Sequence, residues 1–214
     1  NLLSDKNRPR RHFFYLYGGE AQSHKGIFQR CVNRLKGIDL DHLAAQHKSG
    51  FEVMDFSIIV PCIEDMDCLG TELSRMILAE MEIDDVMMEK MCEKCLAFGL
   101  MGSPKLAKIG HDDKILIHIS ITEAVWNSEK VPALARGFIE KFCLKSLPDD
   151  APELFFFFSI EYDDDNHDIR GEIETALSQA VFLKSLGELK MVTEAHIKLW
   201  FTDYARFWET TSAR

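Results

Sequence analysis

The segment from Gly18 to Gly26 contains the residue types that hold phosphate groups in proteins. Its sequence is GGEAQSHKG, and it follows the apolar segment HFFYLY. In a phosphate-binding loop of the pattern G-x-x-x-x-G-K-[ST], backbone N–H groups surround the phosphates, the lysine reaches the terminal phosphates and the hydroxyl group holds Mg²⁺. Gly19 and Lys25 are in register with this pattern. The candidate phosphate-binding residues are Gly18, Gly19, His24, Lys25 and Gly26.

Two positions of this loop depart from the pattern. His24 stands where a second glycine would let the backbone approach a phosphate closely. Gly26 stands where the hydroxyl ligand of Mg²⁺ is required, and Glu20 adds a negative charge that opposes a polyanion. We therefore expect a vestigial site with no bound cofactor and no catalysis, and the binding of ATP or GTP remains an open question.

Nucleotide hydrolysis also needs an acidic residue at the end of a later strand, where it holds Mg²⁺ and positions water. The predicted strand over residues 114–121 ends without an aspartate, and Glu123 is the nearest acid. A later acidic loop, from Glu161 to Asp168, contains Asp163, Asp164 and Asp165. Such a run is typical of a solvated loop. The alternative is a displaced acidic site in a divergent NTPase or nucleotide-binding module, which would combine Lys25 with these aspartates.

Alternating apolar segments and amphipathic segments position these residues. Strands are expected at 12–17, 51–56, 114–121, 153–160 and 189–192, with a further apolar segment at 57–62. Helices are expected at 25–36, 66–81, 84–98, 131–144, 169–182 and 193–208. This alternation predicts an α/β fold, with a mostly parallel sheet between two layers of helices as in P-loop NTPases. Residues 12–214 are expected to form one domain, preceded by a linker remnant at residues 1–11.

Composition narrows the range of functions. The chain has 214 residues with 46% hydrophobic residues, which is enough for a sizeable core. Its net charge of −10 argues against binding to nucleic acid. No apolar run is long enough for a transmembrane helix, and the polar first ten residues do not resemble a signal peptide. Six scattered cysteines are typical of free thiols, so a cytoplasmic location without membrane contact is expected.

The last predicted helix carries aromatic residues at helical spacing. These residues are Trp200, Tyr204, Phe207 and Trp208. Such a face usually packs on the protein's own sheet. If it is exposed, it is a candidate docking face for another domain or another copy of the chain, so a homo-oligomer is one expected arrangement.

Five segments spread along residues 12–204 form one recognisable pattern: HFFYLYGGEAQSHKGIFQRCVNRL, KILIHISITEAVW, VPALARGFIEKF, ELFFFFSIEY and VTEAHIKLWF. In these segments the chain resembles the inactive STAND domains of bacterial conflict systems, which are degenerate relatives of the STAND P-loop ATPases.

This resemblance implies a function in signalling. Domains of this kind usually follow adaptor domains and an effector, such as a protease or nuclease, in one polypeptide. The implied role is sensing, scaffolding or autoinhibition in antiphage immunity, through protein–protein interaction with the effector and adaptor domains. Catalysis is not implied, because the family has lost the hydrolytic residues. The residues at His24, Gly26 and Ser120 agree with that loss.

Overall fold

The computed structural model describes the central part of the chain with several gaps. The described residues are 10–19, 22, 24–36, 50–61, 66–84, 88, 102–143, 147, 149–163, 166–178, 183–189 and 198. Within them, five strands form one sheet: β1 (Arg11–Gly19), β2 (Val53–Ile59), β3 (Lys114–Thr122), β4 (Glu153–Tyr162) and β5 (Lys184–Glu188). The strand order is β2-β3-β4-β1-β5, and each neighbouring pair is parallel. The predicted parallel α/β fold is confirmed.

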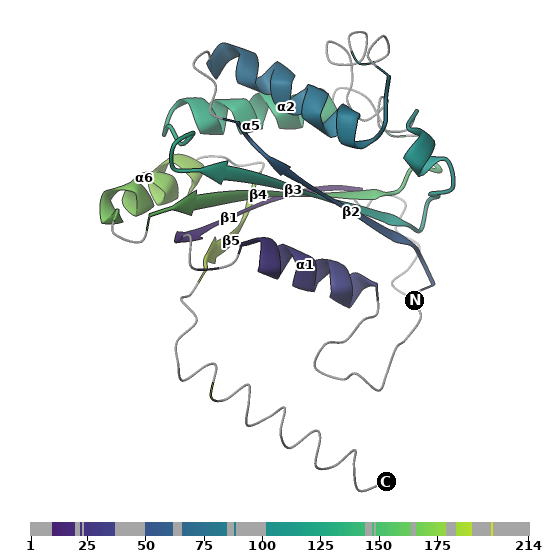
Figure 1. The fold of residues 1–214 in the computed structure, drawn as a ribbon, viewed down its shortest axis with the longest axis horizontal. Coiled ribbons are helices and arrows are strands. Elements are labelled where there is room, and N and C mark those ends of the chain that lie inside the picture. Colours follow the sequence, from purple (N-terminus) through teal and green to yellow (C-terminus); the bar gives the residue numbers. More distant parts are fainter. Residues whose placement is uncertain are drawn as a thin grey trace, which may run out of the picture.

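Helices cover both faces of this sheet (Figure 1). The described helices are α1 (His24–Leu35), α2 (Met66–Glu80), α5 (Lys130–Cys143) and α6 (His167–Ser178), with a short 3₁₀ helix, η2 (Pro104–Leu106). α1 lies on one face, whereas α2 and α5 lie on the other. Ile173 of α6 joins the same apolar cluster as the residues of α2 and α5. The arrangement is the three-layer sandwich that the sequence predicts.

The central strands β1 and β4 are held together by paired aromatic rings. Phe13 stacks on Phe156 with 5.0 Å between ring centroids, and Phe14 stacks on Phe157 at 5.3 Å. Successive side chains of a strand point to opposite faces, so each ring pair contributes to a different apolar layer. This explains why both strands are apolar at nearly every position.

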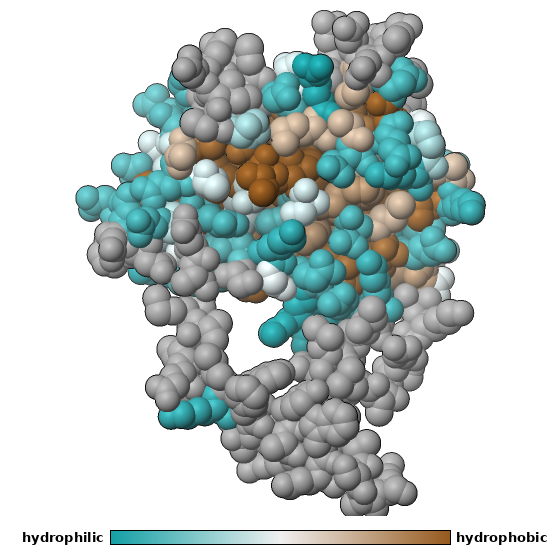
Figure 2. All heavy atoms as spheres, in the orientation of Figure 1, coloured by the Kyte–Doolittle hydropathy of each residue, from teal (hydrophilic) through white to brown (hydrophobic). Residues whose placement is uncertain are grey.

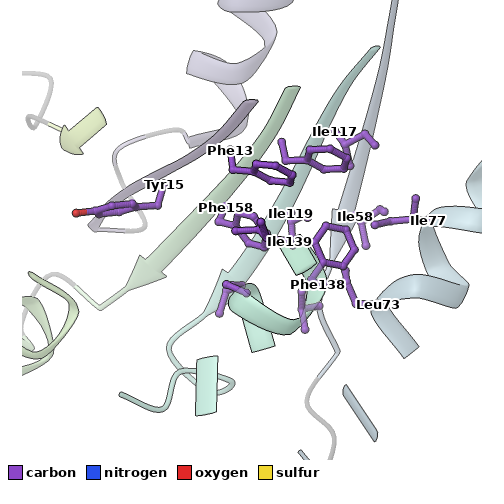
Figure 3. Packing of buried hydrophobic residues seen from close by; sticks show 14 of the residues in the cluster. Phe13, Tyr15, Ile58, Leu73, Ile77, Ile117, Ile119, Phe138, Ile139 and Phe158 are labelled. Atoms are coloured by element: carbon purple, nitrogen blue, oxygen red, sulfur yellow. The ribbon is translucent and has the colours of Figure 1, made fainter. Parts of the chain in front are cut away.

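The two faces of the sheet carry cores of different size. The larger core lies beneath α2, α5 and α6, where the ring of Phe138 of α5 packs edge-on against Phe156 and Phe158 of β4 (Figure 3). The smaller core lies beneath α1, and its buried members among the described residues are Leu16, Phe28, Val32, Leu116 and Phe157. The α1 face therefore leaves room for buried polar groups, among them His24, His118 and Ser159.

Several predicted strand boundaries are wrong. Gly18 and Gly19 do not end β1, because they still pair with Glu161 and Tyr162 of β4. The predicted strand at 51–56 and the apolar segment at 57–62 are one strand, β2. Glu161 therefore belongs to β4, and the acidic loop begins only at Asp163.

β5 covers residues 184–188, where no strand was predicted. Of the predicted strand at 189–192, Leu189 lies just past the end of β5, and residues 190–192 lie outside the described residues. β5 is an exposed edge strand, so it lacks the apolar run on which the prediction relied. Most of the predicted helices at 84–98 and 193–208 lies outside the described residues, as does the segment 1–9. β1 begins at Arg11, the last residue of the predicted linker. No helix in the described part of the chain is long and apolar enough to cross a membrane.

Candidate functional site

The loop between β1 and α1 lies where a sheet of this topology usually binds ligands. The chain leaves β1 toward β2 on one side, and it leaves β4 toward β5 on the other. In open α/β sheets, ligands bind at the carboxyl ends of neighbouring strands whose following connections run to opposite sides of the sheet. At this edge the α1 face carries His24 above the strand residues Ser120, Ser159 and Glu161.

His24 is buried in the space between α1 and the strand ends. Its side chain is 2% exposed. Its Nε2–H donates to the Gly18 carbonyl oxygen at 3.1 Å, and the Ser159 hydroxyl group donates to its Nδ1 at 2.7 Å. Burial lowers the pKa of His24, although the nearby Glu161 carboxylate favours the charged form. A neutral imidazole with both nitrogens bonded therefore stands where a phosphate-binding loop has its second glycine.

The side chain of Gln22 closes the loop from within. The Gly19 N–H donates to Gln22 Oε1 at 3.0 Å. In a phosphate-binding loop, a backbone N–H of this kind would face the phosphate. A Cβ atom at Gly18 would lie 1.9 Å from Gln22 Oε1 and 3.1 Å from Leu189 Cβ. Here the glycine at position 18 accommodates a side chain of the protein itself.

The substitution Gly18→Ala tests this contact. The added methyl group displaces the amide of Gln22, and the Gly19 N–H loses its acceptor. We expect the free energy of unfolding to fall by about 1–2 kcal/mol, the usual cost of one lost hydrogen bond with local repacking. Urea denaturation measures this change. In the double variant Gly18→Ala/Gln22→Ala the alanine at position 18 should cost less than in the single variant, and equal costs would contradict the contact.

Lys25 and Gly26 occupy the first turn of α1 and are exposed. The structure therefore brings Gly18, Gly19 and His24 together at the loop, with Lys25 and Gly26 on its outer surface. Gly26 supplies no hydroxyl group. The carboxyl end of β3 carries Ser120, whose hydroxyl group donates to Glu161 Oε1 at 3.1 Å.

Glu123, the acid nearest to the end of β3, supports the loop after β4. Its Oε2 accepts a hydrogen bond from the Asp163 N–H at 2.7 Å, and its Oε1 accepts one from the Asn166 side-chain amide, Nδ2, at 2.6 Å. Asp163 is exposed beside this contact, whereas Asp164 and Asp165 lie outside the described residues. Within the described ranges, no group of three or more His, Cys, Asp or Glu side chains could hold a metal ion. The aromatic residues Trp200, Tyr204, Phe207 and Trp208 also lie outside the described residues.

His118 is a second buried histidine at this site, and it is not among the site residues predicted from the sequence. It lies in β3, is 1% exposed, and its Nδ1 is 3.0 Å from the Ser57 hydroxyl oxygen. The Phe28 ring of α1 stacks on it at 5.0 Å. Burial, followed by the nearby His24 and Lys25, lowers the pKa of His118 to about 4. The available signal was the polar pair at alternate positions 118 and 120 of an otherwise apolar strand.

The fold and the site define an α/β domain with the layout of a phosphate-loop protein, whose loop forms hydrogen bonds with its own side chains. The inactive STAND family model matches residues 1–160, which include β1 and most of β4. The chain belongs to the inactive STAND family. No curated protein matches the chain.

Proposed function

We propose that this chain is a non-catalytic sensor or scaffold domain of a bacterial immunity-type signalling protein. In this role it acts in the cytoplasm and recruits or regulates an effector in the same polypeptide or pathway. Membership of the inactive STAND family supports the absence of catalysis. The signalling role is our extension of that membership.

The observation that carries the proposal is the contact of His24 with Ser159 and Gly18. A nucleotide could enter the loop only if a side chain that is 2% exposed left its two hydrogen bonds. Hydrogen bonds to buried polar groups are costly to leave unmade. The loop therefore favours a structural role for residues that would otherwise bind phosphate.

The acids near the loop support the same interpretation. Glu161 accepts the Ser120 hydroxyl group, and Glu123 accepts two hydrogen bonds from the loop after β4. A catalytic acid in an NTPase needs a free oxygen toward Mg²⁺ or water. Both side chains have structural partners here, which favours a domain without nucleotide hydrolysis.

Calorimetric titration with ATP and GTP, with and without Mg²⁺, tests the absence of nucleotide chemistry. We expect no Mg²⁺-dependent heat and no phosphate release above the buffer rate. The variant Lys25→Ala is the matched control, because Lys25 is exposed and its loss leaves the His24 contacts in place. Mg²⁺-dependent binding that disappears in Lys25→Ala would overturn the proposal and favour the divergent NTPase or nucleotide-binding module.

The signalling half of the proposal is tested in a protein that carries this domain together with an effector. Deleting the domain should change the effector's activity at least several-fold, upward for autoinhibition or downward for recruitment. The Lys25→Ala variant of the same protein should keep the wild-type activity. An effector whose activity is unchanged by the deletion would contradict the proposed role.

A further inference from the structure

The α1 face of the sheet is covered unevenly by the described helices. α1 lies mainly against β2, β3 and β4 and also covers Leu16 of β1, whereas β5, at the edge of the sheet, lies beyond these main contacts. On the opposite face, three helices share the larger core. We call the surface beside α1, over β1 and β5, the flank surface. It consists of Phe14, Ile27, Cys31, Leu186 and Leu189.

The flank surface is apolar and partly open among the described residues. Leu186 of β5 is 51% exposed and Ile27 of α1 is 38% exposed, whereas most large hydrophobic side chains of the described chain are buried. Lys36 lies on the opposite side of α1 from Ile27, and its Nζ donates a hydrogen bond to Asp55 Oδ1 of β2 at 2.7 Å. Because Ile27 and Lys36 point to opposite sides of the helix, Ile27 leans toward β1 and β5.

The last residue described before the C-terminal segment, apart from Lys198, lies at this surface. The Leu189 N–H donates to the Tyr17 carbonyl oxygen at 2.8 Å, and the Leu189 side chain packs on the core beneath α1. Residues 190–214 follow from this point. They contain an apolar stripe at helical spacing: Ile197, Trp200, Phe201, Tyr204 and Trp208.

Two further features match this segment to the flank surface. Lys198 is helical and exposed, and a helical wheel drawn for residues 193–208 puts it nearly opposite Trp200. The exposed residues Arg30 and Arg34 lie on the Ile27 side of α1, and Asp203 lies beside the stripe. A helix over 193–208 would be about 24 Å long, comparable to the nine-residue strand β1 at about 30 Å.

We propose that residues 193–208 form a helix that docks in cis on the flank surface, with the aromatic stripe against Phe14, Ile27 and Leu186. The segment then supplies the second helix of the α1 layer. A partner that uses Trp200 and Tyr204 for docking has to displace this helix first. The proposal does not depend on the signalling role, because it concerns contacts within one chain.

Hydrogen exchange of the full chain tests this docking. Amides of residues 193–208 should be protected at least tenfold relative to a free peptide of residues 190–214. The variants Ile27→Asp and Leu186→Asp should remove most of that protection, because each places a charge beneath the stripe. Both positions are exposed, so the amides of β1 and β4 should keep their protection in these variants. That protection serves as the control that the domain stays folded.

Ile59→Asp is the matched control. Ile59 is 67% exposed and lies on the same face of the sheet, but in the edge strand β2 on the other side of α1. Figure 2 shows other apolar residues gathered beside β2, so the control changes an apolar surface that the proposal leaves unused. We expect Ile59→Asp to leave the protection of residues 193–208 unchanged.

Three outcomes would overturn the proposal. Protection equal to that of the free peptide excludes docking of the segment. Protection that survives Ile27→Asp and Leu186→Asp places the segment elsewhere. Protection that disappears on dilution, together with a dimer in sedimentation velocity, assigns the flank surface to the segment of a second copy.

Discussion

Replacing His24 by alanine is expected to lower the free energy of unfolding by about 3 kcal/mol. The substitution leaves the Ser159 hydroxyl group and the Gly18 carbonyl oxygen without their partner in a buried position. Each unsatisfied buried group costs about 1–3 kcal/mol, and the space left by the ring adds to the loss. Urea denaturation at pH 7 measures the difference from the wild type.

Lys25→Ala is the control for this measurement. It lies in the same turn of α1 and is exposed, so we expect a change of less than about 0.5 kcal/mol. If His24→Ala and Lys25→Ala lowered the free energy of unfolding by the same small amount, the hydrogen bonds of His24 would not stabilise the fold. His24 would then not be the residue that holds the loop closed.

Between pH 6.5 and pH 4 the fold is expected to lose about 3 kcal/mol of stability through His118. The unfolded chain binds a proton at this histidine below about pH 6.5, its ordinary pKa, whereas the folded chain binds one only near pH 4. Over this window the proton favours the unfolded state, so stability falls as the pH falls. The contribution is fully present above pH 6.5 and fully lost below pH 4.

Denaturation of the wild type and of His118→Leu from pH 7 to pH 4 measures this contribution. The variant cannot take up the proton, so its stability should decline by about 3 kcal/mol less than that of the wild type. Ser57 is exposed and can bond to water when the histidine is absent. The carboxylates and His24 are common to both proteins, so they largely cancel. Identical slopes would show that His118 does not titrate differently in the two states.

The sequence predicts the central strands well because β1, β3 and β4 are buried on both faces. A strand in that position needs an apolar residue at nearly every step, which is visible without a structure. β5 shows the limit of that signal. It is an edge strand with three exposed residues, so its position depends on pairing with β1 and not on its own composition.

At the site, the sequence shows what the loop has lost but not what replaces it. The departures at His24 and Gly26 are visible as residue types. The contact between His24 and Ser159 joins residues far apart in the chain, and it requires the register of β1 on β4. The pairing of His118 with Ser57 likewise requires the register of β2 on β3. Sequence spacing alone contains neither register.

The position of β1 in the sheet has a consequence for how the protein is made. Its two neighbouring strands are β4 and β5, so it pairs with no strand until residues beyond 153 have been synthesised. Contacts of such long sequence separation form slowly, and unpaired apolar strands aggregate. Until β4 emerges from the ribosome, HFFYLY therefore has no strand to pair with. Truncations before Glu153 should accumulate as insoluble protein, and the order of synthesis makes β4 the strand on which productive folding depends.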